Sequence, residues 1–326
     1  MAHELNFFTN GRARMAYVGA TPWHGLGQQL TEGQPLDVWA REAGMDFEIL
    51  EAPVAFRTHN DRTFAYDGKK VLYRSDTEQP LSVVGSRYNV VQPRDVLEFF
   101  KNLTEGFGFQ LETAGVLFQG QKYWALARVG QEAKLRGGDV IKNYVMFATS
   151  CDGTMRTMAK QTDVRVVCNN TITIAVNGKT QEVRISHASK YEPEQVQAEL
   201  GLIDASWAEH VALVKELTKV SLTDKQAVDF TIKMVGDPEK PVDAQPHSND
   251  ISRVLQLYKG RAKGAELESA KDTAWGLVNA FTEVDTWHKG SSQERRLENT
   301  WFFAGDKFKQ RVFSDAVNDF VMASAA

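Results

Sequence analysis

The sequence has 326 residues, of which 42% are hydrophobic and 25% charged, and its formal net charge is −4. These proportions are typical of a folded globular protein and exclude a mainly disordered chain or a collagen-like repeat, while two cysteines are too few for a disulfide scaffold and favour a reducing compartment. No apolar run approaches the roughly 20 residues that span a bilayer, and the first residues lack the apolar core of a signal peptide, so we expect a cytoplasmic protein without a membrane partner.

The charge is unevenly distributed along the chain. Residues 122–190 contain eleven Lys or Arg against five Asp or Glu, a net charge of +6, so the remaining residues sum to −10. A local positive region can attract phosphate in a protein whose overall charge is negative. The alternative is an ordinary solvated face on which the cations cluster by chance.

Residues 46–187 are rich in β-branched and aromatic residues separated by turn signals, a pattern typical of strands. We expect a strand over residues 47–58, which ends at a polar run. A hairpin follows, with Asp67-Gly68 as its turn between residues 63–66 and 71–73.

A second hairpin is predicted around Gln119-Gly120, between residues 113–118 and 123–129, and a further strand over residues 144–148. Residues 164–176 are so rich in β-branched side chains that local propensity leaves both strand and helix open.

Two helices interrupt these strands. Pro35 near the start and Gly44 at the end predict a short first helix. Pro93 opens the second helix, in which an apolar stripe follows helical spacing: Val96, Phe99, Phe100 and Leu103.

From residue 192 onward the apolar spacing becomes helical. A loop with three prolines over residues 236–250 interrupts this region. The expected helices cover residues 196–217, 224–234, 251–258, 270–285 and 306–322.

These patterns predict an α+β fold in two domains. The first, residues 1–190, contains an antiparallel hairpin sheet packed with helices over residues 20–190. The second, residues 191–326, is α-helical and contains the proline-rich loop at 236–250.

Known catalytic patterns are missing from the sequence. It contains no phosphate-binding GxxxxGK[ST] loop, no HExxH and no GxSxG. The seven histidines are scattered without metal-ligand spacing. We therefore expect no catalytic residue, metal or cofactor, although a metal site built from distant residues stays open.

Residues 150–171 contain the highest density of polar side chains that could bind a nucleic acid. Arg156, Lys160 and Arg165 could contact phosphates, because Lys and Arg side chains pair well with phosphate oxygens. Asn169 and Asn170 could add donors to a nucleic-acid backbone or a base edge. The alternative is that the asparagines cap a helix and Arg165 pairs with a carboxylate.

Residues on the second hairpin could extend the same channel. Lys122 and Arg128 would share one side of a strand by alternation. Tyr88 and Tyr123 are candidate stacking platforms for bases, although a tyrosine in a hairpin is more often part of the core.

Five segments carry distinctive motifs: PWHGLG at 22–27, YNVVQP at 88–93, Asp152-Gly153, RVVCNNT at 165–171 and TAWGLVNAFTE at 273–283. Together they resemble a phage and plasmid family known as domain of unknown function 932, and the resemblance covers about residues 20–320. Cys151 departs from the family pattern, which has histidine there in a Ser-His-Asp-Gly sequence.

The resemblance implies a setting in mobile elements, which commonly carry single-strand annealing proteins of the Redβ, Erf and Rad types. Those of the Rad type combine a curved hairpin sheet, a packed helix and a basic groove, and assemble as rings. By this fold-level analogy, we expect a non-enzymatic homo-oligomer, a ring or helical arc, that binds single-stranded DNA and anneals strands in recombination. Host replication or recombination proteins are further possible partners.

Two rival hypotheses remain. One is an enzyme acting on nucleic acid with a metal held by Asp139, Asp152 and Asp163. The other is a regulatory protein of a mobile element whose helical half binds a host factor.

Overall fold

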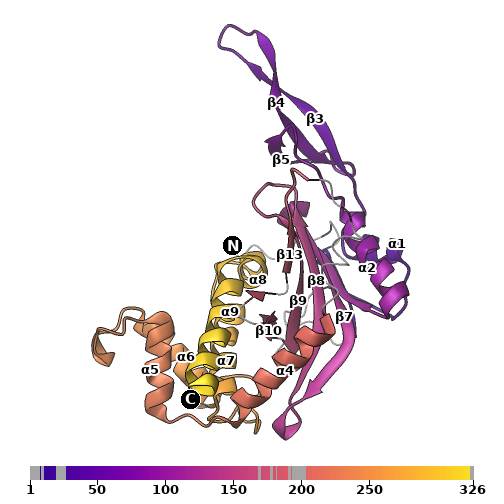
Figure 1. The fold of residues 1–326 in the computed structure, drawn as a ribbon. Coiled ribbons are helices and arrows are strands. Elements are labelled where there is room, and N and C mark those ends of the chain that lie inside the picture. Colours follow the sequence, from indigo (N-terminus) through magenta and orange to yellow (C-terminus); the bar gives the residue numbers. More distant parts are fainter. Residues whose placement is uncertain are drawn as a thin grey trace.

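The computed structural model describes residues 8, 11–19, 27–167, 170–176, 179–180, 182–189, 192 and 203–323. Asn169, Cys168, residues 22–26 and the predicted helix start at 196–202 lie outside these residues. The fold is α+β, as predicted: mostly antiparallel sheets are followed by a helical C-terminal region (Figure 1). None of the helices in these ranges is long and apolar enough to cross a membrane.

The main sheet has eight strands in the order β10-β9-β8-β7-β6-β1-β2, and β13 pairs with β9 beside β10. All neighbours are antiparallel except β1 and β2. The strands are β1 Met15–Val18, β2 Gln28–Leu30, β6 Gln110–Leu117, β7 Lys122–Lys134, β8 Val140–Ser150, β9 Thr157–Arg165, β10 Asn170–Thr173 and β13 Glu182–Ile185.

The second predicted hairpin is confirmed by β6 and β7, which a short 3-10 turn, Phe118–Gly120, connects. The predicted strand at 144–148 lies within β8. The region at 164–176 is strand wherever the structure describes it: the end of β9, then β10, then β11 Ala175–Val176, which pairs with β12 Lys179–Thr180.

Both predicted helices of this half are present, α1 Leu36–Glu42 and α2 Pro93–Phe107, and they cover one face of the sheet (Figure 1). A capping box between Gln92 and Asp95 starts α2, and Gly108, in the left-handed conformation at φ 72°, ends it. The apolar stripe of α2 is buried against Tyr123, Ala125 and other inward side chains of β7 and β8.

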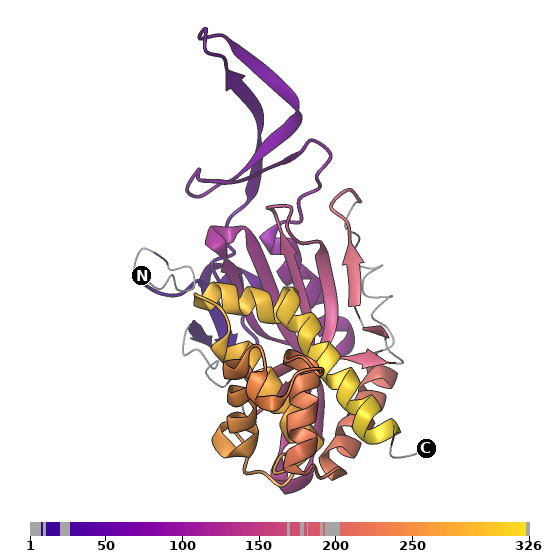
Figure 2. The same cartoon turned by 90° about the vertical axis from the view of Figure 1, so that its left-hand side faces the viewer.

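The C-terminal helices cover the opposite face of the sheet (Figures 1 and 2). Alternation along β7 explains the two layers: Tyr123 and Ala125 join the cluster under α2, whereas Trp124 and Leu126 pack with Trp301 of α8. The helices are α4 Ile203–Lys219, α5 Asp224–Val235, α6 Ser248–Gln256, α7 Ala274–Glu283, α8 Gln293–Phe302 and α9 Ala304–Ala316.

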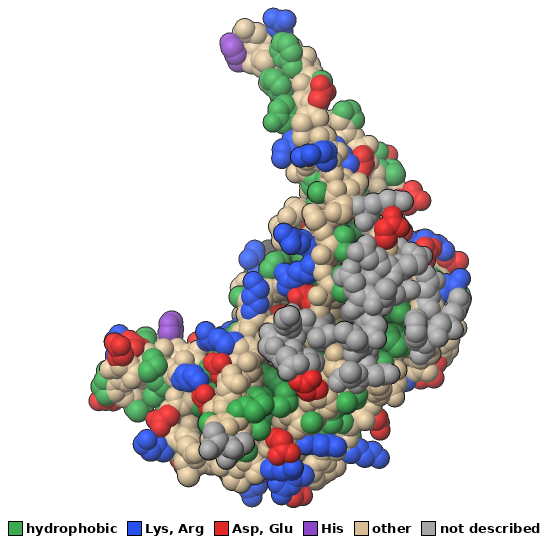
Figure 3. Space-filling view, in the orientation of Figure 1, with side chains coloured by type: hydrophobic (Ala, Val, Ile, Leu, Met, Phe, Trp, Pro, Cys, Tyr) green, Lys and Arg blue, Asp and Glu red, His purple; other side chains and the backbone are tan. Residues whose placement is uncertain are grey.

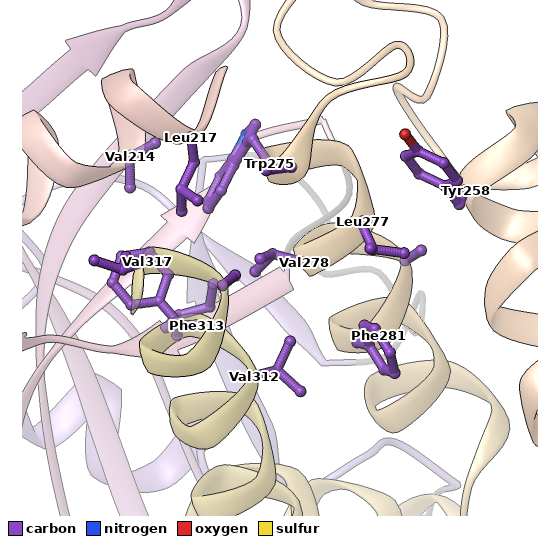
Figure 4. Packing of buried hydrophobic residues seen from close by; sticks show 14 of the residues in the cluster. Val214, Leu217, Tyr258, Trp275, Leu277, Val278, Phe281, Val312, Phe313 and Val317 are labelled. Carbon is purple, nitrogen blue, oxygen red and sulfur yellow. The ribbon is translucent and has the colours of Figure 1, made fainter. Parts of the chain in front are cut away.

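Helix α7 is the centre of the helical layer, because all of its residues are buried. Its apolar side chains meet α4 and α9, and the same cluster includes Ile141 and Ile172 from the sheet. Figure 4 shows this packing, with Val214 and Leu217 of α4, Trp275, Leu277, Val278 and Phe281 of α7, and Val312, Phe313 and Val317 at the C-terminal end. The helical region is therefore joined to the sheet by a shared core.

Three strands form a separate sheet that projects from the body as an arm: β3 Ile49–Arg57, β4 Thr63–Arg74 and β5 Pro80–Gly85 (Figures 1 and 2). The strand predicted over 47–58 is β3. The predicted hairpin turn at Asp67-Gly68 is wrong, because β4 runs straight through it. The turn lies at residues 58–62, where the Thr58 amide bonds to the Arg62 carbonyl.

A bulge explains the misleading turn signal. Pro53 pairs with Lys70 and Ala55 with Ala65, so four residues of β4 face one residue of β3. Gly68 lies within these four residues, and a glycine inside a strand often marks a bulge.

Candidate nucleic-acid interface

Two of the three predicted phosphate contacts lie in the interior. Arg165 and Lys160 are each 2% exposed on β9, facing the C-terminal helices. The Nε of Arg165 lies 2.8 Å from Asp139 Oδ2, and its Nη2 donates to the Gly264 carbonyl over 3.0 Å. The Nζ of Lys160 lies 2.9 Å from Asp306 Oδ2. In this conformation both cations join the sheet to the helices and cannot reach a phosphate.

The other predicted cations do not assemble a track. Arg156 is exposed in the turn between β8 and β9. Lys122 is 4% exposed, with Nζ 2.6 Å from Asp152 Oδ2 and 3.1 Å from Glu298 Oε1. Arg128 is half-buried six residues along β7 from Lys122, about 20 Å in extended strand.

The two tyrosines and Asn170 have structural partners. The Tyr88 ring stacks on His187, with ring centroids 4.3 Å apart, and its hydroxyl donates to the Ser150 carbonyl over 2.8 Å. Tyr123 is fully buried and its hydroxyl bonds to a carbonyl, so it belongs to the core. Asn170 is also buried, and its Nδ2 donates to the Asn279 carbonyl over 3.3 Å. The predicted channel is therefore not brought together on one surface.

The three aspartates of the rival metal hypothesis lie apart, each beside a different basic side chain. Asp139 pairs with Arg165, Asp152 with Lys122, and Asp163 Oδ2 lies 2.8 Å from His210 Nε2. In the part of the chain that the structure describes, no three His, Cys, Asp or Glu side chains come together as potential metal ligands.

A different group of cations lies on the outside of the helical region. Its members come from α6, the loop after it, the segment after α7, α8 and α9, and we call them the basic helical surface: Arg253, Lys263, His288, Lys289, Arg296 and Arg311, with the rings of Trp287 and Phe308. Trp287 and His288 belong to a π-helical segment that continues α7, Val284–His288. Such segments are frequent at functional sites.

Contacts between cations and aromatic rings connect this surface. The Nζ of Lys263 lies 3.7 Å from the centroid of the Trp287 ring. Lys289 Nζ and Arg311 Cζ lie 4.8 Å and 5.5 Å from the centroid of the Phe308 ring. Both rings are partly exposed, so apolar surface lies directly beside positive charge.

The surface is electrostatically positive. Burial, and then the neighbouring Arg253 and Arg296, lower the pKa of His288. None of the five Lys and Arg side chains of this surface forms an ion pair with a carboxylate among the residues the structure places. Lys263 does interact electrostatically with the Glu283 carboxylate, which accepts a hydrogen bond from the Lys263 amide, so an anion would meet positive charge that is only partly neutralised.

Sequence reasoning missed this surface because its residues come from five parts of the helical region. One local signal was available: residues 253–263 contain four Lys or Arg and no Asp or Glu. The larger excess at 122–190 drew attention instead, although several of its cations are buried in ion pairs.

Comparison with protein families gives one match. Residues 80–301, more than half of the chain, match the model described as Domain of unknown function (DUF932). The chain belongs to the DUF932 family. The segment that matches this DUF932 model begins at the first residue of β5 and ends within α8, so it includes most of the basic helical surface. No curated protein and no solved structure matches this DUF932 protein.

Proposed function

We propose that this DUF932 protein binds single-stranded DNA and anneals complementary strands as a homo-oligomer. The observation that carries the proposal is the basic helical surface, in which Lys and Arg side chains border two partly exposed aromatic rings. Proteins that hold single strands without sequence preference combine a positive surface for the backbone with aromatic side chains for the bases.

The proposed mechanism follows from this arrangement. Phosphates bind to Lys263, Lys289 and Arg296 and release counterions, which supplies most of the affinity. Because the contacts are to the backbone, the base edges stay available to pair with a second strand. A repeated surface in a closed ring or arc would keep a long strand extended. The likeness to annealing proteins of the Rad type, an antiparallel sheet with a packed helix, is an analogy of fold alone.

The test is a fluorescence-anisotropy titration of a labelled single strand at about 50 and about 200 mM salt. In the test variant Lys263, Lys289 and Arg296 are replaced with Ala. We expect a loss of affinity of about tenfold or more at low salt, and a log–log salt slope flatter by about 0.7 for each lost phosphate contact. Duplex DNA of the same length should bind the wild-type protein more weakly.

The matched control replaces Lys219, Lys225 and Lys240 with Ala. These exposed lysines already pair with neighbouring carboxylates, so the net charge changes equally while the basic helical surface is kept. Equal binding by the test variant and the control would show that the surface does not carry DNA.

A further inference from the structure

The arm is the most unusual feature of the molecule. Beyond the bulge it consists of only two strands, with Ala55, Phe56 and Arg57 of β3 paired with Ala65, Phe64 and Thr63 of β4. The nine residues of β3 extend about 30 Å, and the arm stands clear of the body in both views (Figures 1 and 2).

Three aromatic side chains of the arm are exposed to solvent. Phe56 and Tyr66 are each 51% exposed and Phe64 is 41% exposed. Phe56 and Phe64 lie directly opposite each other and stack, with ring centroids 5.8 Å apart. Tyr66 follows two residues along β4 from Phe64, at the start of the bulge. Large rings are seldom exposed together without a binding role.

Cations border these rings. The Arg62 guanidinium lies over the Phe64 ring, with Cζ 5.2 Å from the centroid. Arg57 Nη2 lies 3.1 Å from Asp61 Oδ1, but both side chains are more than two-thirds exposed, so water and salt weaken the pair. Figure 3 shows hydrophobic side chains along the arm with Lys and Arg beside them. Residues 55–70 contain four Lys or Arg against two Asp.

We propose that the arm is a second nucleic-acid site, which holds double-stranded DNA with its two-stranded ribbon in a groove. A major groove about 12 Å wide admits such a ribbon. Arg57 and Arg62 would contact the phosphates, and Phe56 and Phe64 would contact the apolar thymine methyl groups that the major groove exposes. The inference goes beyond the proposed function, because the arm would hold the duplex product while the basic helical surface holds single strands.

The charge of the arm argues against a protein partner. The centre of a stable protein interface carries few charges. The narrow arm, with Arg62 directly over Phe64, fits charged DNA better.

The experiment measures binding of a fluorescein-labelled duplex of about 20 base pairs, roughly two helical turns. Two variants alter the arm: F56A/F64A removes the two stacked rings, and R57A/R62A removes the cations. The control is V242A, which shortens an apolar side chain that is 63% exposed and lies far from the arm in sequence. Thermal melting should be similar for all variants, because these side chains are exposed.

We expect F56A/F64A and R57A/R62A each to bind the duplex about tenfold more weakly, V242A to bind as wild type, and single-strand affinity to be nearly unchanged in all three. Duplex binding by both arm variants equal to that of V242A would overturn the inference, as would an absence of duplex binding by the wild-type protein. A changed oligomeric state in F56A/F64A with unchanged duplex affinity would identify a second copy as the occupant and also overturn it.

The two proposals fail separately. If the variant lacking Lys263, Lys289 and Arg296 keeps single-strand binding while F56A/F64A loses duplex binding, the proposed function fails and the arm site stands. If instead the variant lacking Lys263, Lys289 and Arg296 loses single-strand binding while F56A/F64A keeps duplex binding, the arm site fails and the proposed function stands.

Discussion

The Nε atom of Arg165 lies 2.8 Å from Oδ2 of Asp139, in a buried ion pair that connects β9 with the segment before β8. Ser269 also donates a hydrogen bond to Asp139, and Arg165 donates to the carbonyl of Gly264, so the pair fastens the helical region to the sheet. The Arg165–Asp139 pair therefore stabilises the fold and does not form part of a ligand-binding surface.

Replacing Arg165 with Ala should destabilise the protein by about 3–5 kcal/mol, because the Asp139 carboxylate would be left buried without a counter-charge. Urea unfolding followed by circular dichroism measures this loss. The control is Arg156→Ala, an exposed substitution for which we expect a change of about 0.5 kcal/mol or less. Equal stabilities of the two variants would mean that water reaches Asp139 when Arg165 is absent.

Elements that depend on neighbouring residues were predicted from the sequence, whereas elements that depend on contacts distant in sequence were not. The second hairpin and the stripe of α2 followed from neighbouring residues and are confirmed. Asp67-Gly68 misled because a bulge and a turn share the same residue types. Helix α8 was missed because its sequence is mostly polar and its burial depends on contacts with β7.

The candidate site shows the same limit. Lys160 and Arg165 read as phosphate contacts because their carboxylate partners, Asp306 and Asp139, are distant in sequence. Whether a cation faces water or a buried carboxylate is decided by packing, which no local pattern encodes. The basic helical surface is likewise assembled only when five parts of the helical region meet.

Cys151 should resist alkylation in the folded protein. It is fully buried, and burial together with the neighbouring Asp152 raises the pKa of its thiol to about 12. Because the thiolate is the reactive form, iodoacetamide near neutral pH should modify Cys151 only after unfolding. Peptide mass spectrometry with and without urea measures the labelling. Rapid labelling of native protein would show that the turn between β8 and β9 opens readily.

The proposed homo-oligomer predicts a particle larger than the 36.5 kDa chain. Size-exclusion chromatography with light scattering should show a closed assembly or an arc, and single-stranded DNA should favour it because one strand would connect several protomers. The arm variant F56A/F64A serves as a control and should assemble as wild type does. A strict monomer with and without DNA would contradict the annealing mechanism.

Binding of single strands should strengthen as the pH falls, with His288 as the responsive group. In the free protein, burial and the charges of Arg253 and Arg296 lower its pKa below the ordinary value of 6.5. A bound phosphate would cancel the field of these arginines and raise that pKa, so binding would take up a proton and affinity would grow as the pH drops below about 6.5. Each pKa unit gained on binding is worth about tenfold in affinity at low pH.

The stability of the free protein should change with pH in the opposite direction. The unfolded state binds the proton of His288 more readily than the folded state does, so the free energy of unfolding rises as the pH increases toward 6.5 and falls as the pH drops below it. Anisotropy titrations between about pH 5.5 and 8 at constant ionic strength, on wild type and H288Q, measure the first effect, and thermal melting over the same range measures the second. The variant should bind with a flatter pH profile, and an identical profile in the two proteins would exclude His288 from the DNA-binding surface.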